Sequence, residues 1–118
     1  MAKKILIIDD DHVIVKYLES LFRDNGYETC VAFDGIAGAD VFNREKPDLI
    51  TLDLQMPGEW GPRFYRKLTK NKDFKEIPVI VISGLSGREH SINKAVAFFP
   101  KPFEQDKLLE TIKNTIGK

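Results

Sequence analysis

Short apolar runs alternate with amphipathic segments along the chain, and this alternation limits the possible folds more than any other feature of the sequence. The runs are rich in β-branched residues, as in strands that are covered on both faces. Between them, apolar residues recur at helical spacing. Strands that alternate with helices pair in parallel through right-handed crossovers, so we expect an α/β fold. The expected strands span residues 5–8, 27–33, 49–53, 79–82 and 94–99.

The expected helices have recognisable ends. The first runs from His12 and stops at Asn25-Gly26, because glycine is favoured just past a helix C-terminus. The second covers residues 36–45 and follows Asp34, whose carboxylate can cap it. Three more helices are expected: one after Pro62, a short and weak one over 86–93, and a last one from about Glu104.

The strands differ in polarity, and this difference sets their expected order. The first, third and fourth runs are the most apolar and belong in the middle of the sheet, whereas the second contains Glu28 and Thr29 and suits an edge. The resulting order, 2-1-3-4-5, is a doubly wound five-stranded parallel sheet, a flavodoxin-like three-layer sandwich. The 118 residues suffice for one domain and are too few for two, so we expect a single domain over 1–118.

One carboxylate stands at a chemically special place in this arrangement. Residues 49–52 read as a buried strand, Asp53 follows directly, and Met56-Pro57-Gly58 ends the run. In an open α/β sheet, ligands bind beyond the carboxyl ends of the strands, where the strand order reverses. That point lies here between the first and third strands. Asp9, Asp10 and Asp53 should therefore converge in one crevice.

Three converging carboxylates predict a cation. They repel one another at close range unless a positive charge neutralises them, and a set of oxygen ligands favours Mg²⁺. Ser83 ends the fourth strand and Lys101 follows the fifth, so both belong to the same edge of the sheet. A carboxylate, a magnesium ion, a hydroxyl and an ammonium group together suit phosphoryl transfer, with Asp53 as the attacking group.

A structural explanation of the acidic run stays open beside this one. Asp9-Asp10-Asp11 precedes a helix, where acidic residues stabilise the helix dipole without any ligand. Asp11 in particular is expected to be a cap or a solvated first-turn charge.

Composition excludes several classes of function. Eighteen basic and eighteen acidic residues give a net charge of zero, which removes the usual electrostatic basis for direct nucleic-acid binding. The apolar runs are too short for a membrane span or a secretory signal. The single cysteine, Cys30, forms no internal disulfide and fits a reducing compartment. We therefore expect a cytoplasmic protein in which Cys30 is a small buried residue.

Five motifs occur in a fixed order along the chain: Ile8-Asp9-Asp10-Asp11, residues 52–58, Gly61, Val81-Ile82-Ser83-Gly84 and Lys101-Pro102-Phe103. Asp34-Gly35 and Pro47-Asp48 fit the same pattern. Together they resemble the receiver domain of two-component response regulators, over essentially the whole chain. Each motif is weak alone, but their order and spacing are highly specific.

The resemblance implies a phosphoacceptor signalling domain that at most catalyses its own phosphorylation and dephosphorylation. Asp53 would accept a phosphoryl group from the phosphohistidine of a histidine kinase or a histidine phosphotransfer protein. Asp10 and Asp53 would ligate Mg²⁺ together with the backbone carbonyl of Gln55, and Asp9 would act through water.

The remaining implied roles concern the phosphoryl group and the output. Ser83 would hydrogen-bond the phosphoryl group, and Lys101, joined to Pro102 by a cis bond, would pair with it. Ser83 and Phe98 would form the switch that changes the affinity for a downstream protein or output domain. In this family, the output face consists of the fourth helix, the fifth strand and the fifth helix.

The sequence departs from the receiver pattern on this output face. Ser83 and Lys101 are 18 positions apart, about one helical turn fewer than is usual, so we expect a shortened fourth helix. Other departures are Lys94 in place of a glycine, Val96-Ala97 in place of an acidic pair, Phe98 in place of a tyrosine, and Pro100 before the lysine. The site motifs look intact, whereas the output face looks remodelled.

Three other readings compete with a phosphorylated receiver. Asp9-Asp10-Asp11 also fits the signature of haloacid dehalogenase-type phosphatases, with Asp9 as nucleophile and Asp11 as acid, but the later acidic pair is missing and Asp53 would have no role. A receiver-like module could bind partners without being phosphorylated. A flavin-binding fold is disfavoured because acid follows the first strand, where the flavin phosphate would lie.

Overall fold

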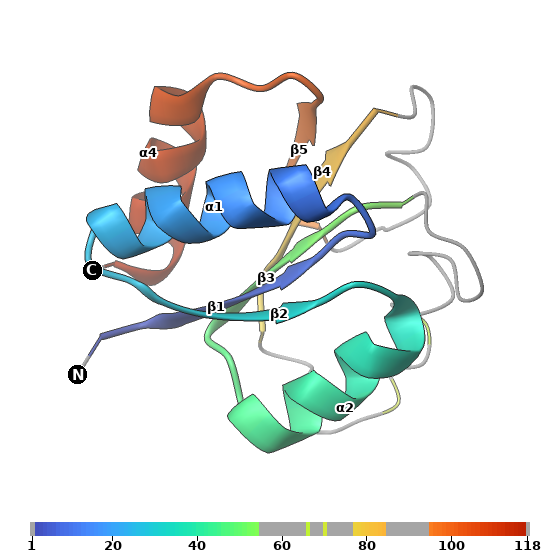
Figure 1. Cartoon of the computed structure of the whole chain (residues 1–118). Helices are drawn as coiled ribbons and strands as arrows, with labels where there is room; N and C mark the ends of the chain where they lie inside the picture. The colour runs from blue at the N-terminus through green and yellow to red at the C-terminus, as the bar shows by residue number, and fades with distance from the viewer. Residues whose placement is uncertain (1, 55–65, 67–69, 71–76, 85–94, 118) are drawn as a thin grey trace.

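The computed structural model describes residues 2–54, 66, 70, 77–84 and 95–117. Its five parallel strands form one sheet in the order β2-β1-β3-β4-β5 (Figure 1). The expected order 2-1-3-4-5 is confirmed. The described elements are β1 (Lys4–Ile8), α1 (His12–Asp24), β2 (Glu28–Ala32), α2 (Gly35–Glu45), β3 (Leu49–Leu52), β4 (Val79–Ser83), β5 (Ala97–Pro100) and α4 (Gln105–Ile116).

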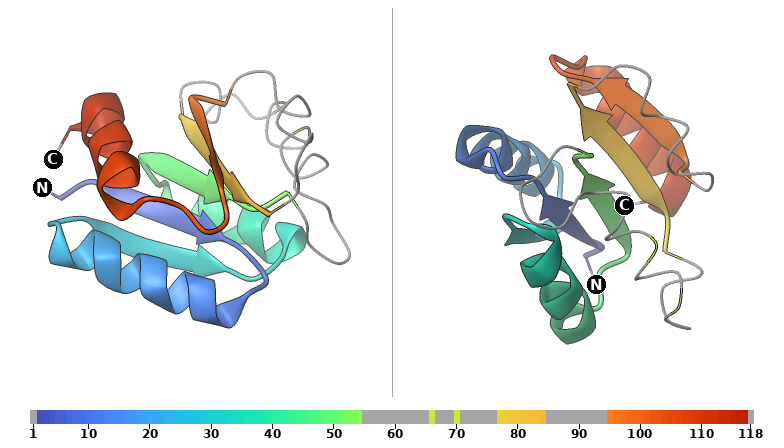
Figure 2. Two further views of the ribbon diagram at one scale, coloured as in Figure 1. Left: turned by 90° about the horizontal axis from the view of Figure 1, so that it is seen from above. Right: turned by 90° about the vertical axis from the view of Figure 1, so that its right-hand side faces the viewer.

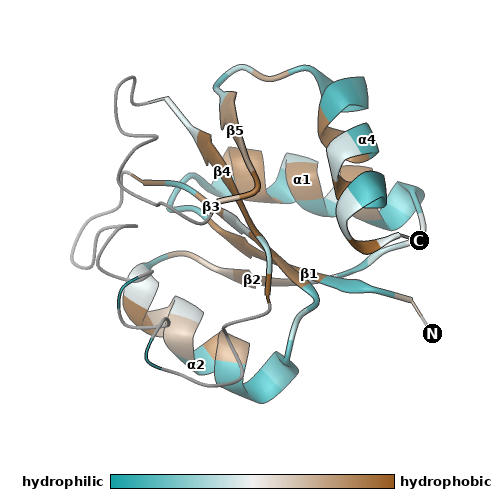
Figure 3. Cartoon of the chain, turned by 180° about the vertical axis from the view of Figure 1, so that it is seen from behind, coloured by the Kyte–Doolittle hydropathy of each residue, from teal (hydrophilic) through white to brown (hydrophobic). Residues whose placement is uncertain are grey.

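Helices cover both faces of the sheet, which explains why the central strands are mostly apolar. Helices α1 and α4 lie on one face and α2 lies on the other (Figures 1 and 2). Strand β1 alternates between the two layers: Ile5 and Ile7 pack with the buried side chains of α1 and α4, whereas Leu6 and Ile8 pack with those of α2. Figure 3 shows the same division, with hydrophobic strands inside and hydrophilic outer helix surfaces.

The helix ends agree with the capping residues in the sequence. The Asp11 carboxylate caps α1 and accepts hydrogen bonds from the backbone N–H groups of Val13 and Ile14. The Asp34 carboxylate caps α2 through the N–H of Ala37, at 2.7 Å. After α1, Gly26 adopts a positive φ of 90°, as expected for the residue that turns the chain out of a helix. These caps fix the loops that lead out of β1 and β2.

All five strand ranges differ from the expectation. Strand β1 begins at Lys4 and not at residue 5, β3 ends at Leu52 and not at residue 53, and β4 extends to Ser83 and not only to residue 82. The other two strands differ as well. Strand β2 is Glu28–Ala32, one residue shorter at each end than predicted, because Tyr27 and Phe33 already belong to the connections. Strand β5 is Ala97–Pro100, so it begins later than residue 94 and includes Pro100. Proline is tolerated there because β5 is an edge strand with one unpaired side.

Several expected features lie outside the described residues. They are the helix after Pro62, the short helix over 86–93 with the shortened fourth-helix region, the turn at 56–58, Gly61, Gln55 and Lys94. Within the described part of the chain, no helix combines the length and apolar character needed to cross a membrane.

Candidate functional site

The site residues stand at the carboxyl ends of four strands and are held by the ladder hydrogen bonds of the sheet. The N–H of Asp53 donates to the carbonyl of Ile8 at 3.0 Å, which extends the β1–β3 pairing by one residue. The N–H of Asp9 donates to the carbonyl of Ala32 at 3.2 Å, which does the same for β1 and β2. Backbone pairing at strand ends therefore fixes both carboxylates relative to one another.

The fourth and fifth strands bring the other polar residues to the same edge. Ser83 is the last residue of β4 and pairs with Pro100 of β5. The N–H of Lys101 then donates to the carbonyl of Ser83 at 3.3 Å. The Lys101-Pro102 peptide bond is cis, as the resemblance implied. The side chain of Lys101 therefore begins directly after β5, at the edge of the sheet that carries Asp53.

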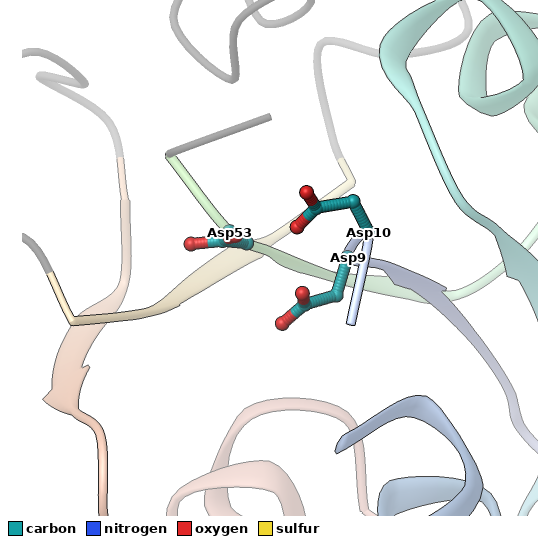
Figure 4. A group of neighbouring side chains, drawn as sticks. All are labelled: Asp9, Asp10 and Asp53. Carbon is teal, nitrogen blue, oxygen red and sulfur yellow. The ribbon is translucent and has the colours of Figure 1, made fainter. Parts of the chain in front are cut away.

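Three carboxylates gather at this edge. Figure 4 shows Asp9 and Asp10 leaving the end of β1 on different sides and Asp53 standing beside them at the end of β3. One oxygen of each lies within 4.8 Å of one oxygen of the others, so a single metal ion could contact all three residues. Asp9 and Asp53 are buried, at 2% and 4% exposure, whereas Asp10 is exposed. The predicted convergence is confirmed.

The ammonium of Lys101 forms ion pairs with the two buried carboxylates, the closer one with Asp9. Its Nζ lies 2.7 Å from Oδ2 of Asp9 and 3.8 Å from Oδ2 of Asp53. The other oxygen of Asp9, Oδ1, accepts a hydrogen bond from the N–H of Asp11 at 2.9 Å. Both oxygens of Asp9 are therefore engaged by groups of the protein.

The carboxylates also keep Lys101 charged. Burial lowers the pKa of the ammonium, but the hydrogen bond to Asp9 and the charges of Asp9, Asp53 and Asp11 outweigh this effect and raise the pKa above the ordinary lysine value of 10.5. Lys101 is therefore a permanent positive charge beside Asp53. Such a charge favours an anionic ligand at the same place.

The two predicted switch residues lie in different environments. Ser83 is 7% exposed, at the carboxyl end of β4, whereas Phe98 is 41% exposed on β5. Phe98 pairs with Val81 across the β4–β5 ladder, two residues before Ser83. The two residues thus lie on neighbouring paired strands.

The sequence did not point to two features of this region. The ring of His12 stacks on Phe33, with centroids 4.0 Å apart and planes 3° from parallel, and so joins the β1–α1 loop to the β2–α2 loop. Thr51 of β3 is 2% exposed, and its hydroxyl has no hydrogen-bond partner among the residues that the structure describes. No periodic pattern or motif signals either feature, because both depend on which loops or strands meet in space.

Comparison with known proteins assigns the family. Residues 5–113 match the family described as the response regulator receiver domain. The chain belongs to this family. It is 33% identical over 117 residues to protein Rrf1 of Nitratidesulfovibrio vulgaris, a match that covers 99% of this chain and 85% of Rrf1.

Two other receivers are similar over nearly their whole length. The polar-differentiation response regulator DivK of Brucella anthropi is 30% identical over 121 residues, covering 99% of this chain and 98% of DivK. The crystal structure of a CheY-like response regulator receiver domain protein from Methanospirillum hungatei superposes with a TM-score of 0.89 at 28% identity, covering 98% of this chain and 94% of the other. The structural similarity therefore agrees with the family to which the sequence belongs.

The geometry of the receiver site disfavours the phosphatase reading. That reading needs Asp11 as a proton donor, but the Asp11 side chain is committed to the first turn of α1 as its cap. It also makes Asp9 the nucleophile, although both Asp9 oxygens are already bound by Lys101 and by the Asp11 N–H. Asp53, which that reading leaves without a role, is the buried carboxylate at the centre of the receiver site.

Proposed function

We propose that Asp53 of this receiver domain accepts a phosphoryl group in a two-component phosphorelay. One observation carries the proposal: a buried carboxylate at the end of β3 is flanked by two further carboxylates and by the ammonium of Lys101. An anion-binding charge and a candidate cation site thus flank one nucleophile. A carboxylate with a purely structural role needs neither a cation site nor an anion-binding charge beside it.

In this reaction, the phosphoryl group moves from an imidazole nitrogen of the donor to a carboxylate oxygen of Asp53. An oxygen of Asp53 attacks the phosphorus of a phosphohistidine, an O–P bond forms, and the N–P bond to the imidazole breaks. The electron pair of that bond stays on the imidazole nitrogen, which takes up a proton. Lys101 stabilises the negative charge on the equatorial oxygens of the transferring group, since its ammonium is already placed beside Asp53.

The donor set fits Mg²⁺. Asp10 and Asp53 would ligate it directly with the backbone carbonyl of Gln55, and Asp9 would contribute through water because Lys101 and Asp11 engage both of its oxygens. Few carboxylates, retained waters and shared phosphoryl oxygens are typical of magnesium sites. The ion supplies charge neutralisation for the phosphoryl group when it is bound.

Phosphorylation would act on a partner through the end of β4 and through β5. Ser83 would hydrogen-bond the new phosphoryl group and draw the end of β4 towards Asp53, and Phe98 would move from its partly exposed position. A two-state element with a small free-energy gap suffices for such a switch. The phosphodonor would be a histidine kinase or histidine phosphotransfer protein of the cytoplasm, and the reader would be a downstream protein or an output domain.

Intact-mass spectrometry after incubation with phosphoramidate tests the phosphoacceptor proposal. With Mg²⁺, the wild type should gain one phosphoryl group, and Asp53→Asn should gain none. The adduct should fall sharply when Mg²⁺ is removed with a chelator. An unmodified wild type that still binds Mg²⁺ would refute phosphorylation and would leave a receiver fold that serves binding alone.

A further inference from the structure

The connection that carries Lys101 from β5 into α4 is fixed by the sheet at its start only. The N–H of Lys101 donates to the carbonyl of Ser83 at 3.3 Å. Helix α4 begins at Gln105, and Glu104, the residue at its N-cap position, makes no side-chain cap hydrogen bond. Helices α1 and α2, by contrast, each start on an aspartate whose carboxylate caps them. The far end of the connection is therefore not held by a cap of its own.

Tyr17 of α1 holds this far end instead. Its hydroxyl donates a hydrogen bond to Oε1 of Gln105 at 3.1 Å, between residues that are 88 positions apart in the sequence. Its ring lies against Phe103, with centroids 5.9 Å apart and planes tilted by 48°. Phe103 in turn packs on the buried side chains between the sheet and helices α1 and α4. One side chain thus contacts the residues two and four positions after Lys101.

Helix α1 also holds the carboxylate with which Lys101 pairs. The N–H of Asp11, the N-cap residue of α1, donates to Oδ1 of Asp9 at 2.9 Å. The other oxygen of Asp9, Oδ2, lies 2.7 Å from Nζ of Lys101. These contacts form a closed circuit from Asp9 through α1 and Tyr17 to Lys101 and back to Asp9. The ammonium that lies 3.8 Å from Asp53 is therefore tied at both ends to one rigid helix.

The exposure of Tyr17 argues against a role in the core alone. Tyr17 is 45% exposed, whereas Val15 and Leu18 on the same helix are at most 2% exposed. A residue that only filled the core would be buried like these two. The ring and hydroxyl contacts of Tyr17 are instead made with the residues that follow Lys101.

We infer that Tyr17 is a positioning residue for Lys101. Tyr17 holds Phe103 and Gln105 against α1. The ammonium of Lys101 then stays beside Asp53, where it stabilises the transferring phosphoryl group, and phosphorylation is faster. This inference rests on the proposed function of Asp53. Misplacing a charged group slows a reaction even when the residue that places it does not touch the reacting atoms.

A second tyrosine of the chain provides a matched control. The hydroxyl of Tyr27 donates to the carbonyl of Gly117 at 2.9 Å and so ties down the opposite end of α4. Tyr17→Phe and Tyr27→Phe therefore each remove one long-range hydrogen bond of this helix region, one at the end that follows Lys101 and one at the far end. Tyr17→Ala removes the ring contact with Phe103 as well.

Two measurements on these variants separate the placement of Lys101 from general stability. The first is the rate at which phosphoramidate phosphorylates Asp53 at saturating Mg²⁺, followed by intact-mass spectrometry. The second is the acetylation of each lysine by a limiting amount of acetic anhydride without Mg²⁺, since an ion-paired amine that is held in place reacts slowly. Lys4 is the internal reference: its side chain is 27% exposed and lies 3.0 Å from Glu45, against 21% exposure for the side chain of Lys101.

The expected effect is specific to Tyr17. Tyr17→Ala should be phosphorylated about tenfold more slowly than the wild type. Its Lys101 should be acetylated severalfold faster, while the acetylation of Lys4 stays unchanged. Tyr17→Phe should lie between Tyr17→Ala and the wild type in both measurements, because it keeps the ring. Tyr27→Phe should match the wild type.

Three results would overturn the inference. The first is a Tyr17→Ala variant that is phosphorylated as fast as the wild type. The second is an equal fall in Tyr17→Phe and Tyr27→Phe, which would assign the effect to the anchoring of α4 as a whole. The third is a slower Tyr17→Ala variant in which the acetylation of Lys101 is unchanged. A wild type that gains no phosphoryl group at Asp53 would refute the proposed function itself, whereas each of the three results leaves that function standing.

Discussion

Thr51→Val should stabilise the protein, although it replaces a residue in the middle of a central strand. Thr51 lies on β3, opposite Ile7 of β1 and Ile80 of β4, and is 2% exposed. Its hydroxyl finds no hydrogen-bond partner among the described residues. Burying a hydroxyl without a partner costs about 1–3 kcal/mol, and valine fills nearly the same volume without that group.

The expected gain in the free energy of unfolding is about 1–2 kcal/mol, which for a domain of this size is a rise in Tm on the order of 5 °C. Equilibrium unfolding in urea measures it, with an unchanged m-value as the sign that the folded state is the same. Thr51→Ser is the control: it keeps the unpaired hydroxyl and loses a buried methyl group, so it should be less stable than the wild type. A Thr51→Val variant less stable than the wild type would contradict this prediction and show that the hydroxyl is satisfied.

Three further predictions concern charges and the cysteine. Lys101→Met leaves the buried carboxylates of Asp9 and Asp53 without their cation, so the free energy of unfolding should fall by about 1–3 kcal/mol, measured in urea without Mg²⁺; no loss would contradict the ion pairing. Because the folded pKa of Lys101 is raised above 10.5, its contribution is fully present below the ordinary lysine pKa and disappears as the pH rises through the folded value, so the two proteins should converge in stability at strongly alkaline pH. Asp11→Ala should cost about 1 kcal/mol in the same assay through the lost cap of α1, and Asp11→Asn should cost less; equal losses would argue against capping. Burial raises the pKa of the Cys30 thiol to about 11, so iodoacetamide at pH 8 should modify it far more slowly in the folded protein than in urea, and equal rates would contradict its half-buried position.

The arrangement of the elements follows from the sequence because hydrophobic burial decides it. The runs Ile5–Ile8 and Val79–Ile82 are apolar at every position, which suits strands with helices on both faces and with no edge exposed to water. Cap residues such as Asp34 act locally through their own backbone neighbours. Local and pattern-based rules therefore suffice to predict the strand order and, apart from the start of β5, the boundaries of the described strands to within one residue.

Details that depend on which side chains meet could not be predicted in the same way. The sequence places Asp9, Asp10 and Asp53 at one edge, but it does not reveal that Lys101 lies closer to Asp9 than to Asp53. Which carboxylate lies closer depends on the conformation of the flexible Lys101 side chain, which begins at the end of β5. Helix α1 shows the same limit: helical spacing predicts an apolar stripe, but it does not reveal that Val15 is buried whereas its neighbour Ile14 is only partly buried.

The most direct test of Asp53 as the phosphoacceptor is to locate the phosphoryl group on the chain. Borohydride reduces an aspartyl phosphate to homoserine, so the protein should be labelled with phosphoramidate and Mg²⁺, reduced, digested and sequenced by tandem mass spectrometry. We expect homoserine at position 53 and unmodified aspartate at positions 9, 10 and 11. Homoserine at position 9 with an intact Asp53 would contradict this expectation and would make Asp9 the nucleophile.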